Sequence, residues 1–127
     1  MTFQEKLERF KAAKKIGGVV NYTPHDITVG DITYPPCGIV ARVEESYETV
    51  GETCEVKQGK VKFYKGNEEF PLQAHEFDGT VNIVSAMVFE QTKNWMTGVW
   101  VSPATGHPDV VRNAKGQIFS VPAFRLL

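Results

Sequence analysis

A segment of small residues near the C-terminus carries groups that could hold a phosphate. Residues 102–109 are rich in proline, glycine and short side chains, so their backbone N–H groups can face a ligand. Thr105 adds a hydroxyl beside Gly106. Arg112, followed by Asn113, can form two parallel hydrogen bonds to a phosphate. The same spacing also fits a plain hairpin connection with a surface arginine, which is the commoner case.

Aromatic residues upstream of this loop suggest how a base could be held. Phe89, Trp95 and Trp100 lie close together in the sequence, and Asn94 precedes Trp95. An aromatic face can stack on a base and an amide can hydrogen-bond to its edge. Together with a phosphate-binding Arg112, these residues predict a nucleotide-type ligand. Core packing is the competing interpretation, because it is the usual role of tryptophan.

Other chemistries find little support in the sequence. The histidines and cysteines of the chain are His25, Cys37, Cys54, His75 and His107. No two of them have the spacing that is typical of a zinc site. The chain has neither a phosphate-binding glycine motif nor a nucleophile elbow. His25 and Asp26 point to opposite faces if they lie on a strand. We therefore expect no enzyme activity, no metal and no cofactor.

Composition narrows the class of protein further. The 127 residues include 14 basic and 15 acidic side chains, a net charge of −1, with 42% hydrophobic and 23% charged residues. These values predict one globular domain and argue against a non-specific binder of DNA or RNA, which needs a basic surplus. The polar N-terminus does not resemble a signal peptide, and no apolar run is long enough for a membrane span. We expect a cytoplasmic protein with reduced cysteines.

The first sixteen residues predict an amphipathic helix. Thr2 and Glu5 have the spacing of a capping box, and glycines at 17–18 end the helix. One face is apolar and the opposite face is charged, with Lys6 on the charged side. The apolar face consists of Phe3, Leu7 and Phe10. This face is too narrow to be stable alone in water, so it must pack on the body of the protein or on another subunit.

The rest of the chain, residues 19–127, predicts a β-rich body. Strands are predicted at 19–22, 26–29, 31–34, 39–43, 47–50, 54–56, 61–64, 79–84, 98–102, 109–112 and 117–121. A turn is predicted at 58–60, and a second helix near 85–94 with Ser85 as its N-cap. The expected fold is a single α+β domain, 1–127, with a mostly antiparallel β-sheet.

Several motifs, taken in order, resemble a family of small phage and prophage proteins. Residues 21–29 match an N-x-T-P-H strand, and residues 34–43 match a P-P-x-G-x-x-A-R-V turn and strand. The resemblance continues through 80–88 and 110–118, so it covers most of the chain after Gly18. Within this group, the sequence resembles the first-described Thoeris anti-defence proteins.

The resemblance implies a function without catalysis. Proteins of that family bind the cyclic ADP-ribose isomer that bacterial TIR enzymes release as an alarm signal, and some capture cyclic oligonucleotides. The family implies a homo-oligomer, at least a dimer, that encloses the signal molecule intact in the cytoplasm of the infected host. By this resemblance Arg112 is the first residue expected to contact the ligand. The N-terminal helix lies outside the matched motifs.

Two other functions stay open at this point. One is a small hydrolase or phosphodiesterase acting on the same nucleotide, with His25, His75 or His107 as general acid–base. The other is a structural phage or prophage accessory protein whose strands only build an oligomer. Chemical identity of the recovered ligand separates a sequestering protein from an enzyme. Loss of ligand binding on Arg112→Ala separates a sequestering protein from a structural one.

Overall fold

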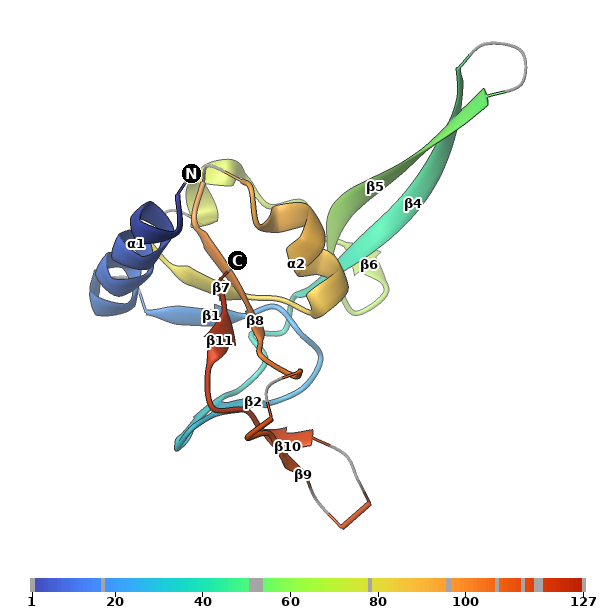
Figure 1. Cartoon of the computed structure of the whole chain (residues 1–127). Helices are drawn as coiled ribbons and strands as arrows, with labels where there is room; N and C mark the ends of the chain where they lie inside the picture. The colour runs from blue at the N-terminus through green and yellow to red at the C-terminus, as the bar shows by residue number, and fades with distance from the viewer. Residues whose placement is uncertain are drawn as a thin grey trace.

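The computed structural model describes residues 2–16, 18–50, 54–77, 79–95, 97–106, 108–112, 114–115 and 118–126. It confirms the expected α+β class (Figure 1). The elements are α1 (Phe3–Ile16), β1 (Val19–Asn21), β2 (Ile27–Val29), β3 (Ile32–Tyr34), β4 (Val40–Val50), β5 (Cys54–Lys65), β6 (Glu68–Glu69), a 3-10 helix η1 (Ala74–Phe77), β7 (Val81–Ile83), α2 (Ala86–Thr92), β8 (Val99–Pro103), β9 (Val111–Arg112), β10 (Ile118–Ser120) and β11 (Phe124–Arg125). No helix among these residues is long and apolar enough to span a membrane.

The centre of the molecule is a mixed sheet in the order β1-β7-β8-β11. β7 pairs in parallel with both β1 and β8, and β11 pairs antiparallel with β8. The antiparallel pairs outside this sheet are β2–β3, β4–β5, β5–β6 and β9–β10. Parallel strands need cover on both faces. The two faces of the central sheet are accordingly covered by different parts of the chain.

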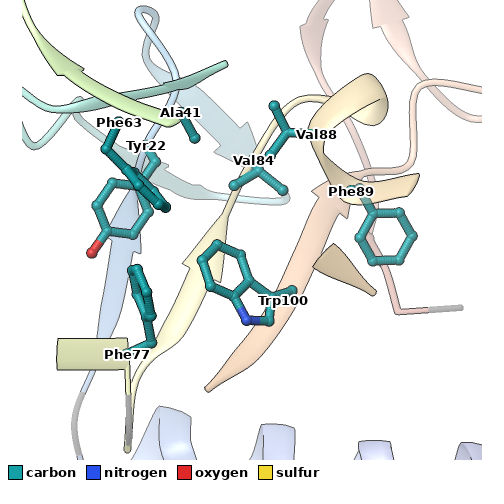
Figure 2. Close-up of a cluster of buried hydrophobic side chains, with 8 residues drawn as sticks. All are labelled: Tyr22, Ala41, Phe63, Phe77, Val84, Val88, Phe89 and Trp100. Carbon is teal, nitrogen blue, oxygen red and sulfur yellow. The ribbon is translucent and has the colours of Figure 1, made fainter. Parts of the chain in front are cut away.

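One face of the sheet carries an aromatic core centred on Trp100 (Figure 2). The ring of Phe77 lies 4.8 Å from that of Trp100, and Tyr22 stacks at 6.4 Å. Phe63, from the base of β5, lies 5.4 Å from Tyr22. This core joins η1, α2 and the β4–β5 hairpin to the sheet.

The opposite face of the sheet is covered by α1 and by the β2–β3 hairpin. The valines and isoleucine of β7 and β8 on this face pack against Phe10, Tyr34 and Phe124. The predicted N-terminal helix is confirmed, and Thr2 Oγ1 accepts a hydrogen bond of 3.2 Å from Glu5 N at its start. Of its predicted apolar face, Phe10 packs against the sheet, whereas Phe3 is 52% exposed. Lys6, expected on the charged face, is instead buried, with 7% of its surface exposed.

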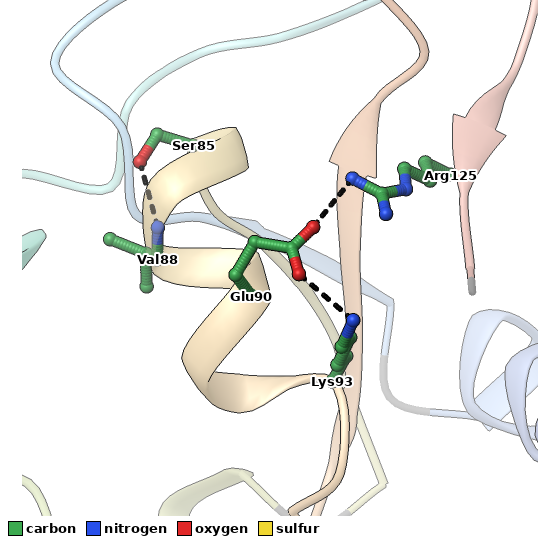
Figure 3. A network of polar contacts seen from close by, with 5 residues as sticks. All are labelled: Ser85, Val88, Glu90, Lys93 and Arg125. Carbon is green, nitrogen blue, oxygen red and sulfur yellow. Dashed lines mark hydrogen bonds and ion pairs between the residues drawn. The ribbon is translucent and has the colours of Figure 1, made fainter. Parts of the chain in front are cut away.

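The second predicted helix is also confirmed. α2 begins after Ser85, whose hydroxyl accepts a hydrogen bond of 3.4 Å from Val88 N (Figure 3). This capping contact satisfies one of the backbone donors that a helix start leaves unpaired. Because α2 connects two parallel strands, it forms a β-α-β unit with β7 and β8. The chain then enters β8 through residues 93–98.

The largest difference from the expected fold is the β4–β5 hairpin, which projects away from the body (Figure 1). The separate strands predicted at 39–43, 47–50, 54–56 and 61–64 belong to two long, continuously paired strands. The turn predicted at 58–60 is wrong, because these residues lie inside β5 and pair with Glu44–Ser46. Among the hairpin residues whose side chains are described, those that join the core lie at its base: Ala41, Val43, Val61 and Phe63.

The N-x-T-P-H motif forms a hydrogen-bonded turn after β1. The Asn21 side chain is buried and donates to the carbonyl oxygens of His25 and Tyr34, each at 2.9 Å. Its Oδ1 accepts from both the backbone N (2.9 Å) and the hydroxyl (2.7 Å) of Thr23. A buried amide with all of these partners fixes the turn. The motif therefore has a structural role in this fold.

Candidate functional site

Trp95, one of the predicted site residues, lies beside a groove in the protein surface. It lies half-buried between α2 and β8. Its ring meets that of Trp100 edge-on at 5.1 Å and lies 6.4 Å from Phe77. The Trp100 indole N–H donates to the Thr97 carbonyl at 2.8 Å, which holds the connecting loop against the core. Trp95 is thus fixed by the core, yet part of its ring stays accessible.

A groove of about 480 Å³ opens beside Trp95. It lies between β5, the segment after β6 and the loop before β8. Its lining is aromatic and aliphatic at the base and polar at the rim, and it comprises Lys60, Val61, Lys62, Phe63, Glu69, Pro71, Leu72, Phe77, Trp95 and Thr97. Ligand pockets for molecules of nucleotide size usually measure 300–1,000 Å³. We call this hollow the Trp95 groove.

The charges at the rim of the Trp95 groove differ in their partners. Lys62 Nζ lies 3.0 Å from Glu44 Oε2, and Tyr64 donates its hydroxyl proton to the same carboxylate. The hydrogen bond to Glu44 and the charges of Glu44 and Glu69 raise the pKa of Lys62. Lys60 forms no ion pair within the described part of the chain, so its ammonium is available to an anion.

This arrangement can bind a molecule that has a flat ring and a negative charge. The exposed part of the Trp95 ring offers a stacking surface, and the Thr97 hydroxyl can exchange hydrogen bonds with a sugar. Lys60 supplies a cation at the rim. The Trp95 groove therefore combines the three kinds of contact that nucleotides need.

The predicted site residues on α2 and just after it differ in their exposure to solvent. Asn94 is exposed, but it does not belong to the lining of the Trp95 groove. Phe89 is fully buried in the core. The Arg125 guanidinium covers its ring at 5.0 Å from the centroid, while also binding Glu90 at 2.9 Å (Figure 3). Stacking of a base on Phe89 does not fit this burial.

The predicted phosphate-binding residues lie elsewhere in the fold. Thr105, Gly106 and Arg112 are exposed, and they follow β8, whereas Trp95 precedes it. Figure 1 shows β9 and β10 beyond the C-terminal end of β8. Five residues of strand span about 16 Å, so one small nucleotide cannot contact both groups within one copy of the chain. Asn113 lies outside the described residues.

Sequence reasoning missed the lysines of the Trp95 groove. Lys60 and Lys62 are two apart and therefore share one face of β5. This spacing is visible in the sequence, but residues 58–60 were predicted as a turn, which hid it. Thr97 was missed because only the fold places its loop beside β5.

Of the residues considered for catalysis or metal binding, the structure describes the side chains of His25 and Cys37; those of His75 and Cys54 lie outside the described part. The His25 side chain is exposed, and its described contacts go through its backbone carbonyl. His107 lies outside the described residues. Cys37 is exposed with a free thiol. Within the described segments, no three His, Cys, Asp or Glu side chains gather in a way that could hold a metal ion.

Comparisons with known proteins leave the family of this chain open. No family model matches the sequence, and no similar curated protein and no similar solved structure was found.

Proposed function

We propose that this protein binds a cyclic ADP-ribose isomer in the Trp95 groove and sequesters it without cleaving it. The observation that carries the proposal is the partly accessible Trp95 ring in a groove of about 480 Å³ with Lys60 at its rim. The motif resemblance to Thoeris anti-defence proteins supplies the class of nucleotide. In the host cytoplasm, such binding would withhold the TIR-derived signal from antiphage immunity.

Each part of the ligand has a matching group. The adenine ring would stack on Trp95 and the ribose hydroxyls would bond to Thr97. The diphosphate would pair with Lys60; Glu44, opposite Lys60 in the strand register, forms its ion pair with Lys62. Arg112 could take part only from a second copy, since it lies beyond the other end of β8.

A second copy of the chain is part of this proposal. The Trp95 groove is open to solvent, and retention of a small ligand needs a closed site. The β4–β5 hairpin is two-stranded over most of its length, and isolated two-stranded hairpins are marginally stable in water. Contact with another protomer would stabilise the hairpin and close the groove. Light scattering should then report a dimer or larger assembly, whereas a monomer at micromolar concentration would contradict this part.

Calorimetric titration with cyclic ADP-ribose isomers tests the binding site. Lys60→Ala should weaken binding roughly tenfold or more, because a charge-assisted hydrogen bond is lost. Lys65→Ala is the matched control: it removes an exposed lysine of the same strand that lies outside the groove lining, and it should leave binding unchanged. Equal affinities of the two variants, or no heat with any isomer, would refute the proposal. Titration of an Arg112→Ala variant adds the test for the structural alternative.

A further inference from the structure

Trp95 also borders a second, much smaller cavity of about 20 Å³. Cationic side chains converge on it from two helices, Lys6 and Arg9 from α1 and Lys93 from the end of α2. The rest of the described lining consists of Trp95, Gly98, Val99, Trp100 and Leu126. We call this hollow the basic cavity. It lies where α1 meets the loop that carries Trp95.

Lys6 is the unusual member of the basic cavity. Only 7% of its surface is exposed, and its side chain has neither an acceptor nor a carboxylate partner in the described parts of the structure. Burial, together with repulsion from Lys93, lowers its pKa. A buried ammonium without a partner is costly, and a methionine of similar length would pack at that position at no electrostatic cost.

Lys93 does not offset the unpaired positive charge of Lys6. Its ammonium lies 2.8 Å from Glu90 Oε2, and the other oxygen of that carboxylate binds Arg125 (Figure 3). Glu90 is therefore shared between two cations. The repulsion between Lys6 and Lys93 persists, and it would be offset by an anion placed between them.

We propose that the basic cavity binds the terminal phosphoryl group of a small ligand. A volume of about 20 Å³ admits one oxygen-sized atom. One phosphoryl oxygen would enter and accept a hydrogen bond from the Lys6 ammonium, while the other oxygens would stay at the mouth near Arg9 and Lys93. The anion would thereby link α1 to the loop that carries Trp95. The proposal does not depend on nucleotide binding in the Trp95 groove.

Titration of the whole protein with inorganic pyrophosphate, followed by NMR, tests this proposal. Amide shifts should concentrate at residues 6–9 and 93–98. Lys6→Gln should weaken pyrophosphate binding roughly tenfold or more. Lys11→Gln removes an exposed cation from the same helix and should leave the affinity unchanged. Lys6→Met repeats the test with a second variant, which also removes the charge and whose side chain suits the buried position.

The outcomes separate the possible sites. If Lys60→Ala weakens pyrophosphate binding and Lys6→Gln does not, the anion binds in the Trp95 groove and the proposal is wrong. Shifts scattered over the exposed lysines would mean non-specific attraction and would also overturn it. A comparison with ADP shows the source of the phosphoryl group: equal affinities indicate a free anion, and tighter binding of ADP indicates a nucleotide end group.

Discussion

Gly98 lies just before β8, and its substitution by alanine should lower the free energy of unfolding more than the same change at a less crowded glycine. Its φ angle is +74°, a left-handed conformation that costs about 1–2 kcal/mol for a residue with a Cβ. A Cβ built there would also lie 2.8 Å from the Phe77 carbonyl oxygen, the Phe77 Cβ and the Asn82 amide nitrogen. Two of these atoms are held by η1 and cannot move aside cheaply.

The magnitude follows from adding the two effects. Overpacking of a dense site costs about 1–3 kcal/mol, so Gly98→Ala should lower the free energy of unfolding by about 2–5 kcal/mol in total. Gly66→Ala is the matched control. Its φ angle is +64°, but nothing lies within 4 Å of the added Cβ, so only the conformational cost of about 1–2 kcal/mol remains.

Urea denaturation followed by tryptophan fluorescence measures both variants. The two tryptophans lie beside Gly98, so the signal reports on the packing in question. Gly98→Ala should show the lower transition midpoint with an unchanged slope. Equal midpoints for the two variants would refute the reasoning, because the close approach of η1 to β8 would then carry no cost.

Two further predictions concern buried polar groups. The Thr92 hydroxyl is buried and has no hydrogen-bond partner in the described structure, so Thr92→Val should raise the free energy of unfolding by about 1 kcal/mol; a loss of stability in thermal melts would show that the hydroxyl does have a partner. Burial, with smaller contributions from Cys37 and Glu76, raises the pKa of Tyr22 to about 12 from its ordinary value of 10.0. Because the unfolded chain releases this proton first, stability should fall by about 2–3 kcal/mol as the pH rises from 10.0 to about 12. Tyr22→Phe should lack that part of the pH dependence, and an unchanged profile would contradict the assignment.

Short-range sequence patterns predicted both helices and the C-terminal hairpin. The helix start at Thr2–Glu5 and the N-cap at Ser85 depend on side chains a few residues apart, and both are confirmed. The C-terminal hairpin, paired through Val111–Arg112 and Ile118–Ser120, also follows from its turn residues. Pairing between distant strands escaped prediction. The parallel neighbours Val19 and Val81 are brought together by the tertiary fold, which no local pattern records.

The candidate site was predictable in part. Trp95, which lines the Trp95 groove, was among the predicted residues because aromatic groups stand out by residue type, whereas the predicted Asn94 is absent from the groove lining. Lys60 escaped since its segment was interpreted as a turn, and buried Lys6 escaped because charged residues usually cover the outer face of a helix. Arg112 was grouped with Trp95 because an arginine can bind the phosphate of a ligand whose base stacks on a tryptophan, but β8 lies between the two residues in the chain.

The chemical state of a released ligand tests the central claim most directly. The protein is incubated with a cyclic ADP-ribose isomer, freed of unbound nucleotide and denatured by heat, and the supernatant is measured by mass spectrometry. We predict recovery of the intact isomer in an amount that matches the bound protein, with a reduced amount from Lys60→Ala. A linear ADP-ribose product, or no retained nucleotide from the unmodified protein, would contradict the account.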